Sequence, residues 1–571
     1  MHRSADVTTL SALAVLVLDA QATAADPRRG ALLEIGWVPW SAGEAREPAA
    51  DDVTAHVVAP PPGAAVPRPV SRLTGLRTSD WARGITPAQA WERLRRAAGA
   101  VAPANGPAPV VIHFARFEEP HLRALHERHG VGPFPFQLLC THAVARRLLP
   151  ELPRRTLRAL AGYFGAAVPP LRRSADHVAA TAFVWRHLVA LLAEREGVAT
   201  LDALQGWLAR PARRVPRRFP LPRERRLELP DRPGVYRLLR AGGAVLYVGK
   251  ATSLRHRVSG HFHAAGRGER ALEMLTQVRD VSWSVAETAL EAALLEADEI
   301  KRLDPPFNVA LAATGRAVHF ATVDLEDLRE TADEAHPVGP LVSPAPFAAL
   351  SALRAILRAG RLGPGSLAQR SRAVGTEPAH GPGPECFAEG FACFAREHGA
   401  PTRTIDVLRL GAWLWARRLE TAGSSRGEDE VSLEAVRRPS WDPERVKEAL
   451  EETAVRAAHA VRRARWLVRL SESTLAWTEP GASRRRLIVI RGGDVTSRAH
   501  LEPGAPGPVP PGHARTPAAR RAAFDLATFD RLRVLTTELR LLAAEAESVD
   551  LRLGAHARLS RRRLQAVLRW V

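Results

Sequence analysis

In this 571-residue sequence, local signals define the fold of residues 230–311 more closely than that of any other part. Two short apolar runs flank a Gly-Gly turn, and a helical pattern follows that ends at prolines. The runs on either side of the turn predict a β-hairpin, and we expect a helix to follow its second strand from about Lys250. Leucine, alanine and isoleucine recur at three- and four-residue spacing across residues 288–302, which predicts a further helix. The Asp304-Pro-Pro sequence ends that helix because proline cannot continue the hydrogen-bonded ladder.

The same segment holds most of the residue types that the rest of the chain avoids. These types are tyrosine, lysine and asparagine, and their eight occurrences are Tyr163, Tyr236, Tyr247, Lys250, Lys301, Lys447, Asn105 and Asn308. Five of the eight lie between Tyr236 and Asn308. Because arginine supplies nearly every other cation, Lys250 is expected where a compact charge with a shiftable pKa serves better than a guanidinium fork. We therefore expect the chemistry of the protein in this segment.

Residues 230–312 resemble the GIY-YIG endonuclease domain of the UvrC and Cho repair excinucleases. The paired motif reads Gly234-Val-Tyr236 and Tyr247-Val-Gly249. The resemblance implies Tyr236, Tyr247, Lys250, Arg257 and Asn308 as catalytic residues and Glu296 as the metal ligand. It also implies Mg²⁺ or Mn²⁺ as cofactor and incision of one DNA strand on the 3′ side of a lesion.

These residue types also suit phosphodiester cleavage, which needs an activated water and neutralisation of the charge on phosphorus. Glu296 can hold a hard Mg²⁺ largely through water molecules. Lys250, three residues after Tyr247, could lower the pKa of that phenol enough for it to act as general base. Arg257 can fork onto a phosphate oxygen. Taken singly, each residue could equally be a buried tyrosine, a surface cation or a helix-face glutamate, but the six together favour a nuclease.

An N-terminal domain is predicted over residues 12–200. Apolar runs from Ala12 and Ala31 predict a hairpin, and the His113-Phe-Ala-Arg-Phe-Glu118 sequence follows later. The region resembles the DEDDh 3′–5′ exonucleases related to the DNA polymerase III epsilon subunit. The resemblance implies an RNase H-like mixed sheet with flanking helices.

The exonuclease site does not carry over intact. Its positions fall on Asp19, Gln21, Glu118, Arg172 and His177. Such enzymes need acidic residues to hold two metal ions and a histidine as general base. Gln21 is neutral where an acid belongs, and Arg172 is cationic where the histidine belongs. Sliding the last motif by one residue brings in Asp176 but places Leu171 at the histidine position. We predict a retained fold that has lost its site and serves to dock DNA or as a scaffold.

Residues 201–229 form a predicted basic linker rich in proline and arginine. Proline is expected to keep it extended, and its arginines could contact phosphates or simply be solvated. The whole chain carries a formal charge of +20 with a pI near 11.2, which suits a polyanionic partner. That charge alone does not distinguish DNA from RNA.

Residues 313–571 are predicted to form a mostly helical accessory region similar to that of UvrC. The family carries a cysteine cluster here, but this region has only Cys386 and Cys393, with Glu397 near a further expected position. Two thiolates cannot complete a four-sulfur site, so we expect no iron–sulfur cluster. Asp442-Pro-Glu predicts a helix that runs to about Leu470. The sequence has no GxxxxGK[ST] phosphate loop, so we expect no nucleotide cofactor.

Together these patterns predict an α/β chain with an RNase H-like domain, a small GIY-YIG domain and a helical C-terminal region. The leading hypothesis is a Mg²⁺-dependent DNA endonuclease of the excision-repair type. The alternatives are a 3′–5′ exonuclease acting through the N-terminal domain and a non-catalytic DNA-binding scaffold. DNA and a helicase-type damage-recognition protein that loads the nuclease are the expected partners. With three cysteines and no apolar run of membrane-spanning length, we expect a cytoplasmic protein that binds no membrane.

Overall fold

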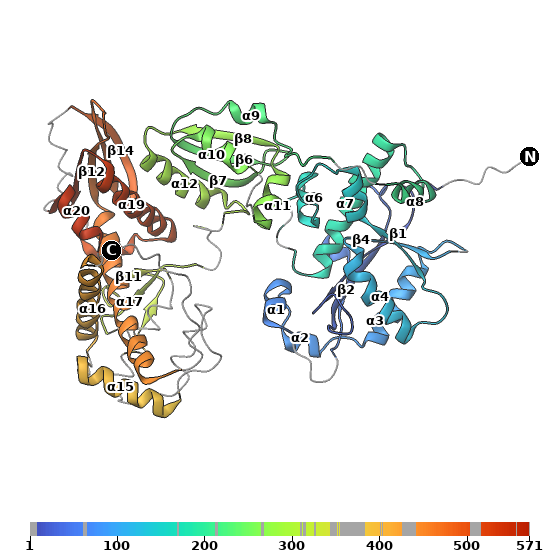
Figure 1. Ribbon diagram of the computed structural model, residues 1–571, viewed down its shortest axis with the longest axis horizontal. Coiled ribbons are helices and arrows are strands. Elements are labelled where there is room, and N and C mark those ends of the chain that lie inside the picture. The colour runs from blue at the N-terminus through green and yellow to red at the C-terminus, as the bar shows by residue number, and fades with distance from the viewer. Residues whose placement is uncertain are drawn as a thin grey trace, which may run out of the picture. The chain divides into compact units, whose positions relative to one another are not determined.

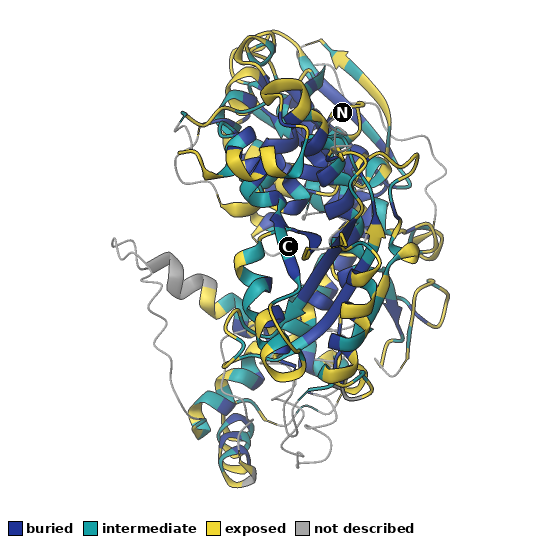
Figure 2. Cartoon of the chain, turned by 90° about the vertical axis from the view of Figure 1, so that its right-hand side faces the viewer, coloured by how far each residue is buried: buried dark blue, intermediate teal, exposed yellow. Residues whose placement is uncertain are grey.

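The computed structural model describes residues 8–60, 66–104, 106–167, 169, 171–211, 215–263, 268–308, 311, 316–324, 327–342, 351, 353, 383–399, 401, 403–424, 441–502, 516–554, 557–569 and 571. The chain forms two compact units, Met1–Ala289 with Pro305–Val309, and Leu290–Asp304 with Ala310–Val571. Each unit has its own hydrophobic core, and the buried residues follow its strands and the helices beside them (Figure 2). The predicted domain boundary at residue 312 lies outside the described residues.

The N-terminal domain is built on a five-stranded mixed sheet (Figure 1). In spatial order its strands are β3 (Thr54–Val57), β2 (Leu32–Trp40), β1 (Val15–Ala22), β4 (Ala108–Ile112) and β5 (Phe136–Cys140). Strand β1 pairs antiparallel with β2 and parallel with β4, and β4 pairs parallel with β5. The predicted hairpin and mixed α/β fold of this domain are therefore confirmed.

Helices cover both faces of this sheet because its central strand is apolar on both sides. Val15 and Val17 of β1 pack in one core cluster with α7 (Ser174–Glu196). Leu16 and Leu18 pack in another with α3 (Pro87–Gly99), while α4 (Ala115–His129) also contributes to that cluster. The alternation of β1 thus divides the core into two layers and places Asp19 at the carboxyl end of a buried strand.

The predicted linker is partly helical, which corrects the expectation of an extended segment over residues 201–229. Helix α8 (Leu201–Ala209) is capped by Thr200, whose hydroxyl accepts a hydrogen bond from the Ala203 amide. Leu204 and Trp207, three residues apart, are buried in the core of the N-terminal domain. Helix α9 (Arg223–Leu227) follows. The first helix extends the N-terminal domain because its apolar pair precedes the proline-rich sequence.

The next domain is a three-stranded antiparallel sheet in the order β7-β6-β8. Its elements are β6 (Gly234–Leu239), β7 (Val245–Ala251), α10 (Leu254–His261), α11 (Glu269–Gln277) and β8 (Asp280–Val285). Gly242 and Gly243 both have φ near 84°, as a tight hairpin turn requires, so the predicted hairpin is confirmed. The predicted helix start at Lys250 is wrong. Lys250 still pairs with Val235 in the sheet, and Ser253 caps α10.

This domain and the N-terminal domain share one unit and contact each other through α11 and α6 (Leu157–Tyr163). Arg158 and Glu273 form an ion pair at 3.1 Å, with less than one fifth of either side chain exposed. Arg279 lies 3.9 Å from the ring centroid of Tyr163. The two domains are therefore joined by specific contacts as well as by the intervening chain.

The C-terminal unit contains two antiparallel sheets and several long helices. The larger sheet runs β14 (Asp494–Leu501), β13 (Arg485–Arg491), β12 (Ser473–Thr478), β15 (Ser548–Leu553) and β16 (Ala557–Ser560). The smaller one runs β10 (Leu328–Arg329), β9 (His319–Ala321) and β11 (Val338–Leu341). The helices are α12 (Ala289–Leu303), α15 (Pro384–His398), α16 (Thr404–Ser424), α17 (Pro443–Leu470), α18 (Pro517–Ala522), α19 (Leu526–Glu545) and α20 (Arg561–Leu568).

The helical C-terminal region and the start of α17 agree with the sequence. The Asp442 carboxylate accepts a hydrogen bond of 2.8 Å from the Arg445 amide, as a helix cap does. Among the described residues, no helix combines the length and the apolar character needed to cross a membrane.

Helix α12 packs into the C-terminal unit, although it directly follows β8 in sequence. Leu290 and Leu294 belong to the core of that unit. Lys301 forms an ion pair of 2.7 Å with Asp530 of α19, a carboxylate that also accepts two hydrogen bonds from Arg316, at 2.8 and 2.6 Å. The Asp530 side chain is 1% exposed. One face of α12 is thus fixed by apolar packing and by a buried charge cluster.

We expect Asp530→Asn to lower the free energy of unfolding of the C-terminal unit by about 3–5 kcal/mol, because two cations lose their buried counter-charge. Denaturant unfolding of the full chain measures this loss. Asp494→Asn is the control, since Asp494 is 67% exposed in its pair with Arg531 and should change stability by less than about 1 kcal/mol. Equal effects of the two substitutions would contradict a buried cluster.

Candidate active site

The two halves of the Gly234-Val-Tyr236 and Tyr247-Val-Gly249 motif face each other across β6 and β7. Tyr236 lies opposite Gly249 in the register of the two strands, and its side chain is fully buried. A Cβ atom on Gly249 would lie 2.4 Å from the Tyr236 hydroxyl and 2.8 Å from the Tyr247 ring. Only glycine leaves room for both rings at this point, so the motif is one packing arrangement.

Three aromatic rings gather beside this glycine. The ring centroids of Tyr236 and Tyr247 are 6.1 Å apart, and His261 lies 5.6 Å from the first and 5.8 Å from the second. A hydrogen bond of 2.5 Å joins the Tyr236 hydroxyl to Nε2 of His261. Tyr236 is fully buried and Tyr247 half-buried, so the latter phenol is the more accessible to water.

His261 is a neighbour of the motif to which the motif's own sequence assigns no role. The residue ends α10, seven positions after Leu254 and three after Val258, which are both buried. Helical spacing therefore places all three on one face of α10, directed toward the sheet. That periodicity is the signal that could have identified His261 as a neighbour of the motif.

Asn308 fixes the backbone of the edge strand β7. Its Oδ1 accepts a hydrogen bond from the Val248 amide and its Nδ2 donates one to the Val248 carbonyl, both at 2.9 Å. The side chain thus pairs with the residue between Tyr247 and Gly249. In this arrangement Asn308 is a positioning residue for the motif, since both polar groups of its amide are engaged by the backbone.

The two predicted cations lie on different elements. Lys250 is half-buried near the end of β7, and Arg257 is exposed on α10, where it can meet a large ligand. Because side chains alternate along a strand, the Cβ atoms of Tyr247 and Lys250 leave opposite faces of β7. The three-residue spacing alone therefore does not place the Lys250 ammonium beside the Tyr247 phenol.

Glu296 lies half-buried on α12, in the C-terminal unit. The residues that fix this helix, Leu290, Leu294, Asp298 and Lys301, follow one another at three- and four-residue steps. Glu296 projects from the opposite side of the helix, as the 3.6-residue repeat requires. Its grouping with the tyrosine motif in the other unit stays a prediction from the sequence.

All five positions of the predicted exonuclease-like site line one cavity of about 690 Å³ in the N-terminal domain, called the front cavity here. The Asp19 carboxylate lies 3.4 Å from Nδ1 of His177, and the Gln21 amide donates a hydrogen bond of 2.9 Å to the Arg172 carbonyl. Asp176 instead accepts hydrogen bonds from the Arg172 and Arg173 amides at the start of α7. The structure thus favours His177 over Asp176 as the residue at the aspartate position.

Burial dominates the electrostatics of the front cavity. It raises the pKa of Asp19 and raises the pKa of Glu118 well above its ordinary value, and the mutual repulsion of the two carboxylates raises the pKa of Glu118 further. Burial likewise lowers the pKa of His113 to about 3, so this imidazole is neutral. A side-chain hydrogen bond between the two carboxyl groups acts to raise the pKa of Glu118 and to lower that of Asp19.

The front cavity does not fit a centre of two divalent cations. Within the described part of the chain, one oxygen each of Asp19, Gln21 and Glu118 is buried without a hydrogen-bond partner. Two of these residues are acids whose pKa values are raised, and the third is a neutral amide. The cationic residue Arg172 is also in the lining. Two dications need more negative charge than this arrangement supplies.

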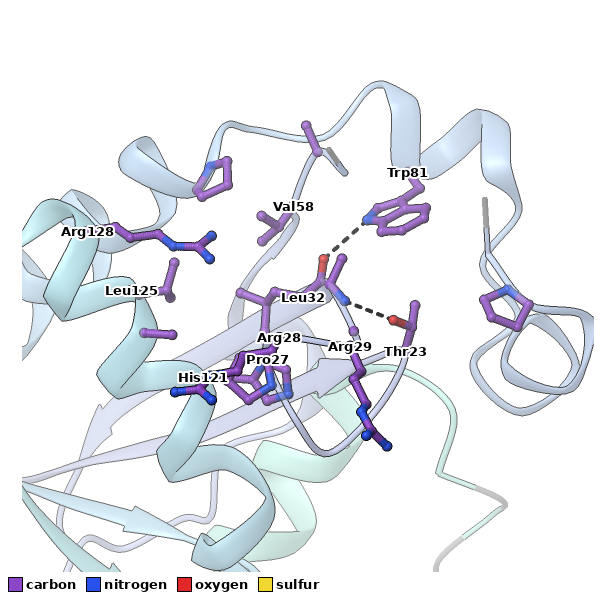
Figure 3. Close-up of a pocket in the computed structure, with 16 residues that line it drawn as sticks. Thr23, Pro27, Arg28, Arg29, Leu32, Val58, Trp81, His121, Leu125 and Arg128 are labelled. Carbon is purple, nitrogen blue, oxygen red and sulfur yellow. Dashed lines mark hydrogen bonds between the residues drawn. The ribbon is translucent and has the colours of Figure 1, made fainter. Parts of the chain in front are cut away.

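A second hollow in the same domain, of about 520 Å³, is basic (Figure 3). Arg28 and Arg29 come from the turn between β1 and β2, and Arg128 comes from α4. His121 forms a hydrogen bond of 2.8 Å with the Ala24 carbonyl, and burial lowers its pKa, so its imidazole is neutral above that pKa. No acidic residue is among the described residues of the lining. The arginines can meet phosphate groups there.

The predicted cysteine positions lie next to a small polar cluster on α15. Cys386 and Cys393 are free thiols. Nε2 of His398 lies 2.8 Å from the Glu451 carboxylate, and the Lys447 ammonium lies 2.7 Å from Glu397. The ammonium already balances the Glu397 carboxylate, so the cluster is satisfied as an ion-pair network.

Comparison with known proteins assigns the segment that carries the tyrosine motif. The family described as the UvrC-like GIY-YIG domain matches residues 232–309. UvrABC system protein C of Rhizobium meliloti is 48% identical over 83 residues, which are 14% of this chain and 12% of that protein. A Mycobacterium tuberculosis protein described as a bifunctional exonuclease/endonuclease is 31% identical over 416 residues, 71% of this chain and 61% of the relative. The chain thus spans less than two thirds of the length of either relative.

Two solved structures are also similar over parts of the chain. The GIY-YIG N-terminal endonuclease domain of UvrC from Thermotoga maritima, bound to magnesium, is 30% identical, with 15% of this chain and 94% of that one covered and a TM-score of 0.14. Exonuclease X in complex with 5′ overhanging duplex DNA is 17% identical, with 32% of this chain and 93% of that one covered and a TM-score of 0.22.

The family match and the relatives define what the chain contains. Residues 232–309 form a UvrC-like GIY-YIG domain, which is the domain of a nuclease. An exonuclease-like region precedes it, in agreement with the similarity to the mycobacterial relative. The chain therefore combines two nuclease-type modules with a further C-terminal unit.

The bond between Tyr236 and His261 predicts an energetic coupling of the two side chains. In a double-mutant cycle with Tyr236→Phe and His261→Phe, we expect a coupling of about 1 kcal/mol in the free energy of unfolding. Pairing Tyr236→Phe with His256→Phe, an exposed position on the same helix, is the control and should show none. Absence of coupling in both cycles would mean that the bond does not form.

The raised pKa of Glu118 predicts a pH-dependent effect of Glu118→Gln. Between the unfolded pKa, near 4.3, and the raised folded pKa, the folded state binds more protons, so stability falls as pH rises. The amide cannot ionise, so the variant should gain stability over the unsubstituted protein as pH rises from 5 to 8. Calorimetric unfolding of the full chain measures this. The partly exposed neighbour Glu119, paired with Arg123, is the control, and a pH-independent difference would refute a raised pKa of Glu118.

Proposed function

We propose that this protein is a divalent-cation-dependent DNA endonuclease that nicks one strand through its GIY-YIG domain. The observation that carries the proposal is that the UvrC-like match over residues 232–309 contains all six predicted site residues. Tyr236, Tyr247 and the opposed glycine form the compact cluster described above. We further propose 230–312 as the nuclease domain, 12–200 as an inactive exonuclease-like domain and 313–571 as an accessory region.

The residues divide the work of hydrolysis among themselves. Glu296, a carboxylate, can hold Mg²⁺ or Mn²⁺. When bound, such an ion supplies charge for the phosphate and acidifies water. The accessible Tyr247 can take a proton from the attacking water as the phenolate, after its own hydroxyl proton has passed to solvent, while exposed Arg257 forks onto a phosphate oxygen. Lys250 supplies further positive charge for the phosphate.

The remaining residues hold these groups in place. His261 bonds to the buried Tyr236 hydroxyl and so fixes the ring that packs against Gly249. Asn308 holds the backbone on either side of Val248, and with it the strand that carries Tyr247 and Lys250. Positioning of this kind matters because small displacements of reacting groups reduce rates strongly.

By analogy with the UvrC family we also propose incision on the 3′ side of a lesion, loading by a helicase-type damage-recognition protein, and a cytoplasmic location. DNA as the partner agrees with the charge of +20 and with the nuclease relatives. Without a cysteine quartet, we propose that the accessory region works without an iron–sulfur cluster.

A 3′–5′ exonuclease is the second candidate, because the front cavity does gather all five corresponding positions. The neutral Gln21 and the cationic Arg172 in the lining, beside the two acids Asp19 and Glu118, argue against two bound cations. We therefore propose that this domain docks DNA without cutting it.

Nicking of a covalently closed DNA circle with Mg²⁺ tests the proposal. Glu296→Gln should lower the nicking rate at least about 100-fold, because the ion loses its protein carboxylate while most phosphate contacts remain. Asp19→Ala is the matched control and should leave every product unchanged. Normal nicking by Glu296→Gln would refute the assignment of the ligand. Mononucleotides released from a free 3′ end, and lost in Asp19→Ala, would establish the exonuclease instead.

A further inference from the structure

The charges of α17 are distributed unevenly along the helix. Its first half, residues 443–456, carries four glutamates, of which Glu444 pairs with Lys447 at 3.0 Å and Glu452 pairs with Arg456. Its second half, residues 457–470, carries four arginines and one histidine and contains no acidic residue. The first half of α17 thus contains both acidic and basic side chains, whereas the second half contains basic side chains only.

The basic half of α17 borders a groove of about 420 Å³, called the arginine groove here (Figure 1 shows α16, α17 and α20). Arg462, Arg465 and Arg469 project from α17 into its lining, and all three are exposed. Their spacing of three and four residues places them on one face of the helix. Arg409 of α16 adds a fourth guanidinium, which pairs with Asp406 at 3.4 Å.

The floor of the arginine groove is apolar. It is formed by Ile405, Leu408, Ala412, Ala458, Val461, Trp466, Val567 and Val571. Trp466 is buried, and its indole donates a hydrogen bond to Thr536, so it does not offer a stacking surface. Among the described residues of the lining there is no acid. The charged groups that a ligand meets are therefore the arginines on the rim.

Further cations surround the same part of α17. Burial lowers the pKa of half-buried Arg463, and the charges of Arg533 and Arg540 on α19 lower it further. Burial also lowers the pKa of His459, with Arg463 as the next cause. Like charges that crowd a folded surface repel one another, and bound anions relieve that repulsion.

We propose that the arginine groove binds the phosphodiester backbone of DNA, so that the C-terminal unit holds the substrate that the GIY-YIG domain cuts. This proposal rests on the proposed function for the identity of the nucleic acid. The seven residue steps from Arg462 to Arg469 span about 10 Å along the helix, close to three phosphate steps of one DNA strand, each about 3.4 Å along the DNA axis. Guanidinium groups suit this ligand because they fork onto phosphate oxygens.

An acidic protein segment is the competing occupant, and the arrangement of charges favours DNA. The groove presents a run of similar guanidinium groups, with no described acid in its lining that would select a particular peptide. The whole chain carries +20, so a polyanion gains from attraction well beyond the groove itself. The two occupants differ in a measurable way, because each phosphate contact on duplex DNA releases about 0.9 counterion.

The test is the salt dependence of duplex binding by the full chain carrying Arg465→Gln and Arg469→Gln, measured without divalent cation. Loss of two phosphate contacts should lower the slope of log K against log salt by about 1.8. Affinity should be about 60-fold weaker at 0.1 M salt and converge with that of the unsubstituted chain near 1 M. Glutamine keeps both positions polar and helix-compatible.

The control pair is Arg95→Gln with Arg96→Gln on α3, where both arginines are exposed and already paired with Glu92. It removes the same charge and should leave the slope unchanged. An unchanged slope in the Arg465/Arg469 variant, or equal losses in both pairs, would overturn the proposal. Nicking of closed circles is assayed separately. A lowered slope in a protein that does not nick would refute the endonuclease and leave the groove proposal standing. Nicking by a variant with an unaltered slope would support the endonuclease and refute the groove proposal.

Discussion

The pairing of Tyr236 with Gly249 across β6 and β7 is the constraint on which the candidate site depends. Because glycine leaves the space above its Cα empty, a fully buried tyrosine ring can lie against the neighbouring strand. Tyr247 and His261 then complete a triangle of rings whose centroids are about 6 Å apart. Asn308 secures the outer edge of the same strand with two backbone hydrogen bonds. Gly249 thus leaves space that the rings of Tyr236 and Tyr247 occupy, and Asn308 holds the backbone of β7 by hydrogen bonds.

Helix α12 is divided between the two ways of dividing the chain. By sequence it belongs to the matched segment 232–309, and by packing it belongs to the C-terminal unit, through Leu290, Leu294 and the buried pair of Lys301 with Asp530. The proposed metal ligand Glu296 lies on this helix. The core of the C-terminal unit therefore fixes the helix that carries this residue.

Local signals in the sequence predicted the hairpin and the cap at Asp442, because each depends on a few neighbouring positions. The set of site residues came from a family resemblance and stays a prediction. Contacts between distant elements are harder to predict: helical periodicity shows which face of α10 carries His261, but not that α10 folds back so that His261 meets Tyr236. Lys250 was expected to begin a helix, but cross-strand pairing with Val235 extends β7 past it. Helix α8, in the predicted linker, forms because apolar residues such as Trp207 find a core that the linker sequence does not reveal.

Like charges are brought close together at two places in the chain, in the front cavity and around α17. The consequence for ligand binding differs because the charged groups differ. In the front cavity, burial raises the pKa of both Asp19 and Glu118, so the two carboxyl groups resist carrying negative charge together. Around α17 the crowded groups are guanidiniums, which do not lose their proton in proteins. The front cavity therefore offers less negative charge than two dications need, whereas the arginine groove keeps its positive charge and attracts a polyanion.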